Sequence, residues 1–149
     1  MKTATFRATI ILLSLFLSVG CGNQNDQKNE CASLACQQQE LYDQIILVHD
    51  EVMPKLSDIA ILKGKIKEQL ALATDSVVIM QWQDHLQALD AADQAMWVWM
   101  RQFESEMDTV VSEATFRYFE EQMLKVDTVA FNINRSIEHA EQALGNDQP

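Results

Sequence analysis

Residues 113–145 read EATFRYFEEQMLKVDTVAFNINRSIEHAEQALG, and their apolar side chains recur every three or four positions. This spacing predicts one long α-helix with a single apolar stripe along its length. Ser112 and Glu113 form a favourable helix start, and Gly145 forms a favourable helix stop. The stripe consists of Phe116, Phe119, Met123, Val126, Ala130, Ile133, Ile137, Ala140 and Leu144.

The segment before this helix has the same period. Asp75 or Ser76 can cap its start, and its stripe runs to Val110. We therefore expect a second helix, with short breaks at 74–76 and at about 108–112. Its stripe consists of Val78, Trp82, His85, Leu89, Ala92, Met96, Trp99, Phe103 and Val110, with Met107 beside it.

A third periodic segment extends from about Leu34 to Ala73 and contains Pro54. A proline inside a helix costs about 3 kcal/mol. Because the apolar phase continues across Pro54, we expect one helix that is kinked near residues 50–54. The alternative is two helices joined there, which would give four helices in all. The stripe consists of Leu41, Ile45, Val48, Val52, Leu56, Ile59, Leu62, Ile66 and Leu70.

Long helices joined by short connections must run antiparallel. We therefore expect an all-α fold, an elongated up-down-up three-helix bundle with coiled-coil-like packing. The chain contains only 4 Gly and 2 Pro, too few for a turn-rich β fold or a Gly-rich phosphate loop. A net charge of −11 argues against nucleic acid as a partner.

The beginning of the chain has the organisation of a signal peptide. Lys2 and Arg7 precede an apolar run over 8–19, which is too short to span a membrane as a helix. Small Gly20 then precedes Cys21. We interpret residues 1–20 as a signal peptide and 21–32 as a polar tether that begins with a lipidated cysteine. Residues 33–145 are then the helical domain and 146–149 a disordered tail. An uncleaved anchor helix is the alternative for the first segment.

The residues Ser18, Val19, Gly20 and Cys21 resemble the lipobox of bacterial lipoproteins, with Ser18 where that family favours Leu. The resemblance implies that the Cys21 thiol carries two acyl chains, so that a membrane holds the protein through lipid. In this family an Asp after the lipidated cysteine retains the protein at the inner membrane. Gly22 stands there, which implies the outer membrane.

Cys31 and Cys36 lie five positions apart. Outside the cytoplasm two nearby thiols usually pair. Within one regular helix they would point about 140° apart, which is a poor geometry for a disulfide. A disulfide becomes feasible if Ser33 caps the helix and Cys31 precedes it. A cross-link to another chain and two free thiols are the alternatives. We expect no metal site from these two cysteines alone.

No motif in the chain indicates an enzyme. The sequence contains no GxSxG, no Gly-rich phosphate loop, no HExxH and no ExxH pair. The acidic side chains fall mostly on the polar faces of the expected helices, where water solvates them. We therefore expect neither catalysis nor an obligatory cofactor.

One group of residues has metal-ligand chemistry. In an antiparallel bundle the expected turns bring five side chains to one level: His49, Met53, Met96, Met100 and Met123. Thioethers and an imidazole suit Cu(I), and a His/Met pair can also ligate haem iron. A thinner cluster joins Met80 and His139. The alternative interpretation is that these side chains only fill the core.

The stretch 96–100 (MWVWM) is apolar all round a helix, so Trp97 and Val98 must point away from the apolar stripe. Pro54 is expected at the same level. Together these three residues predict an exposed apolar patch that could bind a partner protein. The alternative is that the bend of the first helix covers them.

Residues 49–55 (HDEVMPK) and 92–100 (ADQAMWVWM) resemble a group of small helical bacterial lipoproteins of unknown function. Some members carry a label borrowed from viral A-type inclusion proteins. The resemblance implies no activity. We therefore expect a lipid-anchored cell-envelope protein with a structural or protein-binding role. The alternative is a periplasmic Cu(I)- or haem-binding bundle that uses the His/Met level.

Overall fold

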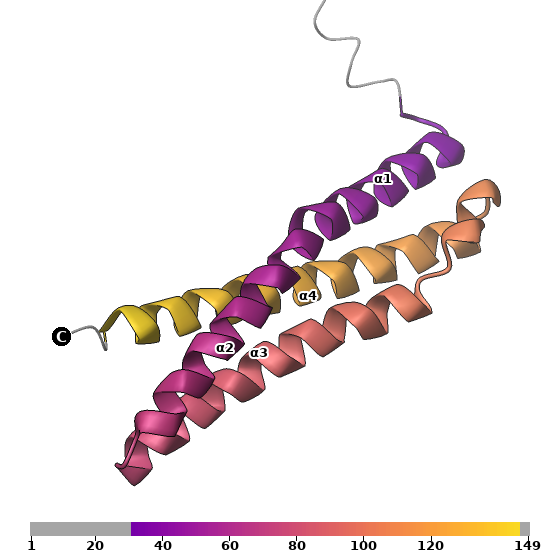
Figure 1. Ribbon diagram of the computed structural model, residues 1–149. Helices are drawn as coiled ribbons and strands as arrows, with labels where there is room; N and C mark the ends of the chain where they lie inside the picture. The colour runs from indigo at the N-terminus through magenta and orange to yellow at the C-terminus, as the bar shows by residue number, and fades with distance from the viewer. Residues whose placement is uncertain (1–30, 147–149) are drawn as a thin grey trace, which may run out of the picture.

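The computed structural model describes residues 31–146 (Figure 1). The predicted signal peptide, the lipidated Cys21 and the tail residues 147–149 lie outside this range. Within it the chain is mostly helical and contains no strand, which confirms the all-α prediction. The elements are α1 (Leu34–Val52), the 3₁₀ turn η2 (Met53–Lys55), α2 (Leu56–Leu72), α3 (Ser76–Gln102), the 3₁₀ turn η3 (Ser105–Thr109) and α4 (Glu113–Asn146).

Polar side chains fix the starts of three helices. The Ser33 hydroxyl accepts a hydrogen bond from the Cys36 backbone N–H at 3.2 Å at the start of α1. The Asp75 carboxylate accepts bonds from the backbone N–H groups of Val77 and Val78 at the start of α3. At α4, the Ser112 hydroxyl accepts from the N–H of Thr115 at 3.1 Å. These caps satisfy N–H groups that have no partner inside the helix.

The bend near Pro54 takes the form of a single 3₁₀ turn. The flanking residues Val52 and Leu56 keep right-handed helical backbone angles, so no extended residue separates α1 from α2. Pro54 lies in the first turn of this element, where its missing N–H removes no bond. Figure 1 shows the resulting change of direction between α1 and α2. Residues 34–72 therefore form two α-helices with a bend between them. As in the two-helix alternative, α1 and α2 are separate elements. As in the kinked helix, the backbone keeps helical angles on both sides of the bend.

The prediction that the middle helix continues to about residue 107 is wrong. α3 ends at Gln102, and Phe103 adopts an extended backbone while its N–H still bonds to the Trp99 carbonyl. The next backbone N–H, of Glu104, donates to the Tyr118 hydroxyl at 2.7 Å. A side chain of α4 therefore accepts the hydrogen bond that a backbone carbonyl would accept if α3 continued. Val110, expected in the apolar stripe, is 54% exposed.

The helix α4 is the central element, because it packs against α1, α2 and α3. Figure 1 shows α4 between α1 and α3 at one end, while α2 crosses it and runs along the first half of α3. Apolar side chains from all four helices form one core along this axis. Its largest fully buried members are Ile45, Val52, Ile59, Ile66, Leu89, Met96, Phe119, Val126 and Ile133.

Four polar side chains are also buried: Gln38, Thr115, Gln122 and Ser136. Among the described residues, every buried side-chain nitrogen or oxygen has a hydrogen-bond partner. None of the helices in 31–146 has a stretch long and apolar enough to cross a bilayer.

Candidate functional site

A groove runs along the surface between α3 and α4. Its first part has a volume of about 430 Å³. The α3 side of this part consists of Ala95, Val98, Trp99 and Gln102, and the α4 side consists of Leu124, Lys125, Thr128 and Val129. Its lining is therefore mostly apolar.

A second depression of about 330 Å³ lies further along the same two helices. Its lining residues are Ala88, Ala91 and Ala92 from α3, and Asn132, Arg135, Ser136 and His139 from α4. Residue numbers fall along α3 while they rise along α4, so the two depressions follow one another between antiparallel helices. On α3 the edge residues are spaced three or four apart, which places them on one side of the helix. We call the two depressions together the α3–α4 groove.

Two large apolar side chains that line this groove are exposed, and a third exposed apolar side chain lies further along α4. Val98 is 42% exposed on the α3 side, and Leu124 is 70% exposed on the α4 side. Phe131, which lies three positions after Thr128 on the same helix, is 59% exposed. Burying a side chain of this size stabilises a protein by about 1.5–3 kcal/mol. An apolar ridge left in water beside a groove is typical of an interaction surface.

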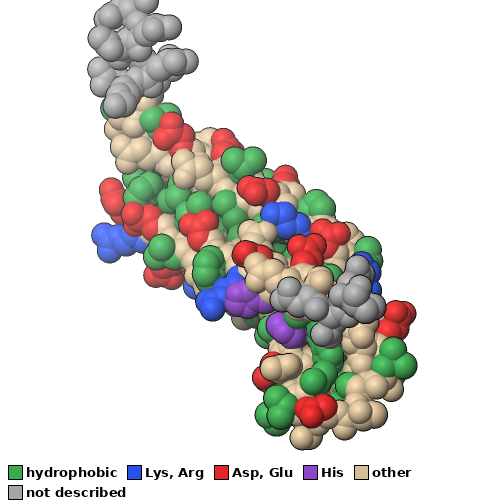
Figure 2. All heavy atoms as spheres, turned by 90° about the vertical axis from the view of Figure 1, so that its left-hand side faces the viewer, with side chains coloured by type: hydrophobic (Ala, Val, Ile, Leu, Met, Phe, Trp, Pro, Cys, Tyr) green, Lys and Arg blue, Asp and Glu red, His purple; other side chains and the backbone are tan. Residues whose placement is uncertain are grey.

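The α4 rim of the groove is positively charged in a chain that is strongly acidic. Lys125 and Arg135 both line the groove. In the described part of the chain neither of them forms an ion pair, and the Arg135 guanidinium lies over the Phe131 ring at 5.9 Å. Acidic side chains are spread over the face shown in Figure 2, with a few basic ones among them. The groove is therefore suited to a ligand with apolar and anionic groups.

The residues of the predicted patch separate onto two edges of α3. Val98 faces the α3–α4 groove. Trp97 is 44% exposed, and its indole N–H donates to Asp93 at 3.1 Å. Asp90, seven positions before Trp97 and hence on the same edge, forms an ion pair with Lys63 of α2. Trp97 therefore stands on the edge of α3 that faces α2, and the exposed Pro54 lies at the α1–α2 junction.

Of the predicted His/Met level, the structure shows one contact, between His49 and Trp99. The His49 ring packs against the Trp99 ring with 5.8 Å between centroids, so α1 and α3 meet at the expected height. One ring nitrogen of His49, Nδ1, lies 2.9 Å from the Asp50 carboxylate. Met96 is fully buried, while Met53, Met100 and Met123 are partly buried against the core.

The two members of the thinner cluster have different surroundings. Met80 is exposed near the start of α3. His139 is exposed on α4 and lines the α3–α4 groove beside Arg135.

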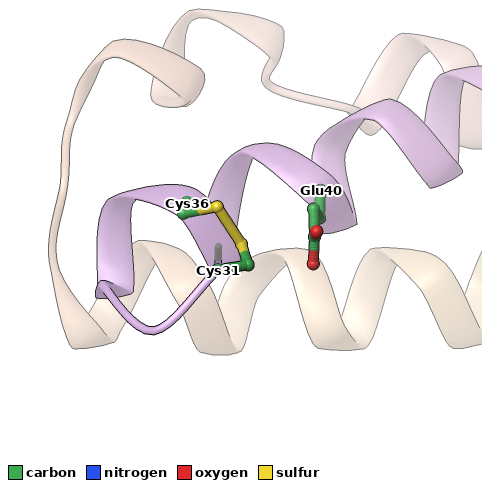
Figure 3. Close-up of side chains that lie close together, drawn as sticks. All are labelled: Cys31, Cys36 and Glu40. Atoms are coloured by element: carbon green, nitrogen blue, oxygen red, sulfur yellow. A yellow bond between two sulfur atoms is a disulfide. The ribbon is translucent and has the colours of Figure 1, made fainter. Parts of the chain in front are cut away.

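At the start of α1, Cys31 and Cys36 form a disulfide, with 5.1 Å between their Cα atoms. This is the arrangement in which the sequence made a disulfide feasible, because Ser33 caps the helix and Cys31 precedes it. Figure 3 shows the Glu40 side chain one turn further along the same helix. Among residues 31–146, these three form the one group of three or more His, Cys, Asp or Glu residues whose ligand atoms converge.

Sequence reasoning missed Leu124, Phe131 and Glu40. The two apolar residues lie outside the stripe of α4, and a search for periodic apolar positions passes over them. The signal that finds them is a large apolar side chain on the polar face of a helix. Glu40 was missed because no local pattern shows that Cys31, which precedes the helix, comes close to the face that Cys36 and Glu40 share.

Compared with known proteins, the chain matches no protein-family model, no curated protein and no solved structure.

Proposed function

We propose that this chain is a lipid-anchored protein of the bacterial cell envelope that binds a partner protein and catalyses no reaction. Cys21 carries the lipid, and residues 22–32 form the rest of the tether. The helices form an elongated up-down-up antiparallel bundle with coiled-coil-like packing. The membrane that holds the anchor is the outer membrane. The two resemblances described above, at the lipobox and in the helical region, support these assignments.

The observation that carries the binding role is the α3–α4 groove with its exposed apolar rim. Leu124 is 70% exposed, whereas the apolar stripe of α4 is largely buried. From Ala88 to Gln102 the α3 edge extends about 21 Å at 1.5 Å per residue. A groove of this length between two helices accommodates an amphipathic helix of several turns, which would dock through apolar side chains at helical spacing.

The partner helix is acidic at its flanks. Lys125 and Arg135 stand on the α4 rim, where they would meet its carboxylates. The strongly acidic chain makes these two cations on one rim a favourable place for an anionic partner. Charge complementarity of this kind mainly raises the association rate and selects the partner.

The tether is long enough to free the groove from the membrane surface. Ten positions separate Cys21 from Cys31, which allows a span of at most about 33–36 Å. The described helices begin directly after this tether. The groove can therefore face away from the bilayer while the lipid holds the chain in place.

The partner test uses a photo-crosslinking amino acid at position 98 of the full chain in cells. We expect one discrete crosslinked product, and we expect Leu124→Lys to remove it while the protein level stays unchanged. The same amino acid at position 47 is the matched control, because Leu47 is a highly exposed apolar residue of α1 outside the groove. Equal crosslinking at 47 and 98, or persistence in Leu124→Lys, would contradict a groove-specific partner.

A separate experiment tests the anchor. Cells that express the chain are fed an alkyne-labelled fatty acid, and the purified protein is examined for label. We expect labelling that Cys21→Ser abolishes, because only the Cys21 thiol would carry acyl chains. Cys36→Ser is the control and should keep the label. Label that persists in Cys21→Ser would overturn the assignment of the lipid to this residue.

A second candidate function is Cu(I) or haem binding by His49, Met53, Met96, Met100 and Met123. The observation in its favour is the contact between the rings of His49 and Trp99, since Trp99 lies between Met96 and Met100 in sequence. This contact supports a common level for the soft ligands of α1 and α3. The Cu(I) titration described in the Discussion separates this role from partner binding.

A further inference from the structure

The start of α1 brings together three side chains with metal-ligand chemistry. The sulfur atoms of Cys31 and Cys36 and a carboxylate oxygen of Glu40 all lie within 4.8 Å of one another (Figure 3). The two cysteines are partly buried, and Glu40 is exposed. The carboxylate is therefore open to solvent while the sulfurs are held against the protein, so an ion can approach from the side of Glu40.

Hydrogen bonds hold this geometry in addition to the disulfide. The Gln37 side-chain amide donates to the Cys31 carbonyl oxygen at 3.3 Å, which ties the residue before the helix to the first turn. The Ser33 hydroxyl caps the N–H of Cys36, and the Gln37 N–H bonds to the Ser33 carbonyl at 3.1 Å. Because these bonds do not involve sulfur, they can keep the two thiols close after the disulfide is reduced.

The helix places the second and third ligands on one face. Cys36 and Glu40 are separated by four positions, so they lie one above the other along α1. Two thiolates and one carboxylate match the ligands that Zn²⁺ takes in proteins, and a water molecule can complete a tetrahedral site.

We propose that the Cys31–Cys36 disulfide is the closed form of a redox-gated zinc site, which opens on reduction and binds Zn²⁺ through Cys31, Cys36 and Glu40. This site is separate from the α3–α4 groove and does not depend on partner binding. In the oxidised form each sulfur is bonded to the other and neither is a thiolate. In the reduced form both sulfurs are available as anionic ligands, and Glu40 adds the third negative charge.

The reaction sequence balances with a dithiol as the reductant. A thiolate of the dithiol attacks one sulfur of the disulfide, and its second thiol then closes the reductant's own disulfide. The dithiol loses two electrons and two protons, and Cys31 and Cys36 gain them as two thiols. Zn²⁺ then displaces the two thiol protons, which leave to solvent, while the Glu40 carboxylate binds without losing a proton.

The test titrates Zn²⁺ into the full chain in detergent micelles against a chromogenic chelator. Cys21→Ser is present in every sample, so that Cys31 and Cys36 are the only cysteines. We expect one Zn²⁺ per chain after reduction with a phosphine and none in the oxidised protein. Glu40→Gln should weaken binding about tenfold or more. Asp43→Asn is the matched control, because it removes an equal charge from an exposed position of α1 and should change the affinity less than twofold.

Co²⁺ gives a second readout that reports on geometry. Thiolate ligation should produce an intense sulfur-to-cobalt absorption band, which Cys36→Ser should remove. Helical circular dichroism of the reduced chain serves to show that the fold persists. Equal affinity of Glu40→Gln and the parent would overturn the three-ligand site, and equal binding by oxidised and reduced protein would overturn the redox gate. Zn²⁺ binding no tighter than that of a Cys31→Ser, Cys36→Ser variant would overturn the proposal as a whole.

Discussion

The indole N–H of Trp99 donates a hydrogen bond to the side-chain oxygen of Gln122 at 3.1 Å, in the buried interface between α3 and α4. Trp99 is 5% exposed and Gln122 is 3% exposed. A tryptophan can be buried at little cost only if its N–H finds a partner. This pair therefore sets the register between the two helices that form the groove.

Replacing Gln122 by Met should destabilise the protein by about 1–3 kcal/mol, because the Trp99 N–H loses its partner without access to water. Chemical denaturation of the full chain in detergent measures this. Gln142→Met is the matched control, since Gln142 is exposed on the same helix, and its effect should stay within about 0.5 kcal/mol. In a double-mutant cycle, Trp99→Phe should cost less in the Gln122→Met background than in the parent. Additive effects would show that the bond contributes no coupling.

Truncation of Trp99 should destabilise the protein far more than truncation of Trp97. Trp99→Ala should lose about 3–5 kcal/mol, as expected for a large buried aromatic side chain. Trp97 is 44% exposed, and its bond to Asp93 lies at the surface, so Trp97→Ala should change the unfolding free energy by less than about 1 kcal/mol. Denaturation curves of the two variants decide this. A loss of several kcal/mol in Trp97→Ala would show that Trp97 belongs to the core.

The apolar period predicted the helices well because most of their burial follows one stripe. Trp99 and Phe119 both lie on predicted stripes, and both are buried. The apolar period failed to predict the end of α3, because the apolar stripe continues past the last helical residue. Phe103 continues the stripe of α3 and packs against Tyr118 and Phe119, yet it lies just outside the helix. Contacts with α4 decided where α3 ends, and no local pattern contains those contacts.

The sequence pattern also failed to predict which polar residues are buried. Gln38 and Gln122 are almost fully buried, but a search for apolar positions assigns them to solvent. Their burial depends on partners far away in the chain, such as the Val110 carbonyl for Gln38. Of the candidate site, the sequence singled out Val98 correctly as exposed. It could not show that Leu124 lies opposite, because that requires the register between α3 and α4.

Gly64→Ala should stabilise the protein by about 0.5–1 kcal/mol, because Gly inside a helix costs this much relative to Ala. Gly64 lies in the interior of α2, and a Cβ added there meets no atom within 4 Å. Thermal unfolding should therefore shift upward. Gly145→Ala is the control, since its added Cβ is equally free, but it lies at the end of α4, where the gain should be smaller. A decrease in stability in Gly64→Ala would mean that this surface of α2 is covered in solution.

Cu(I) should bind the oxidised chain no more tightly than it binds a His49→Ala, Met100→Leu variant. The reason is that the Asp50 carboxylate contacts one ring nitrogen of His49, and the ring itself packs against Trp99. Met96 is fully buried, so ligation would require the core to open. The disulfide must be kept intact in this titration, because free thiols also bind Cu(I). Stoichiometric binding that the double variant loses would establish the His/Met site instead.

Gln38 links α1 to the segment between α3 and α4, and its replacement should loosen that segment first. Its side-chain amide donates to the Val110 carbonyl at 3.0 Å, and its side-chain oxygen accepts from the Ser112 N–H at 3.4 Å. Gln38→Leu should cost about 1 kcal/mol, because two backbone groups lose a partner in a part-buried place. Limited proteolysis should then cut within 103–112 faster than in the parent.

Gln39→Leu provides the comparison for this prediction. Gln39 is the next residue of α1, but its amide donates to Asp43 at the surface, where water can replace it. Its stability loss should therefore stay within about 0.5 kcal/mol, with no change in proteolysis. If the protease cleaves both variants at the same rate, α1 does not hold the connection between α3 and α4. The η3 turn and the Glu104–Tyr118 bond hold it instead. Faster cutting in Gln38→Leu alone would show that α1 orders the start of α4 through a single buried amide.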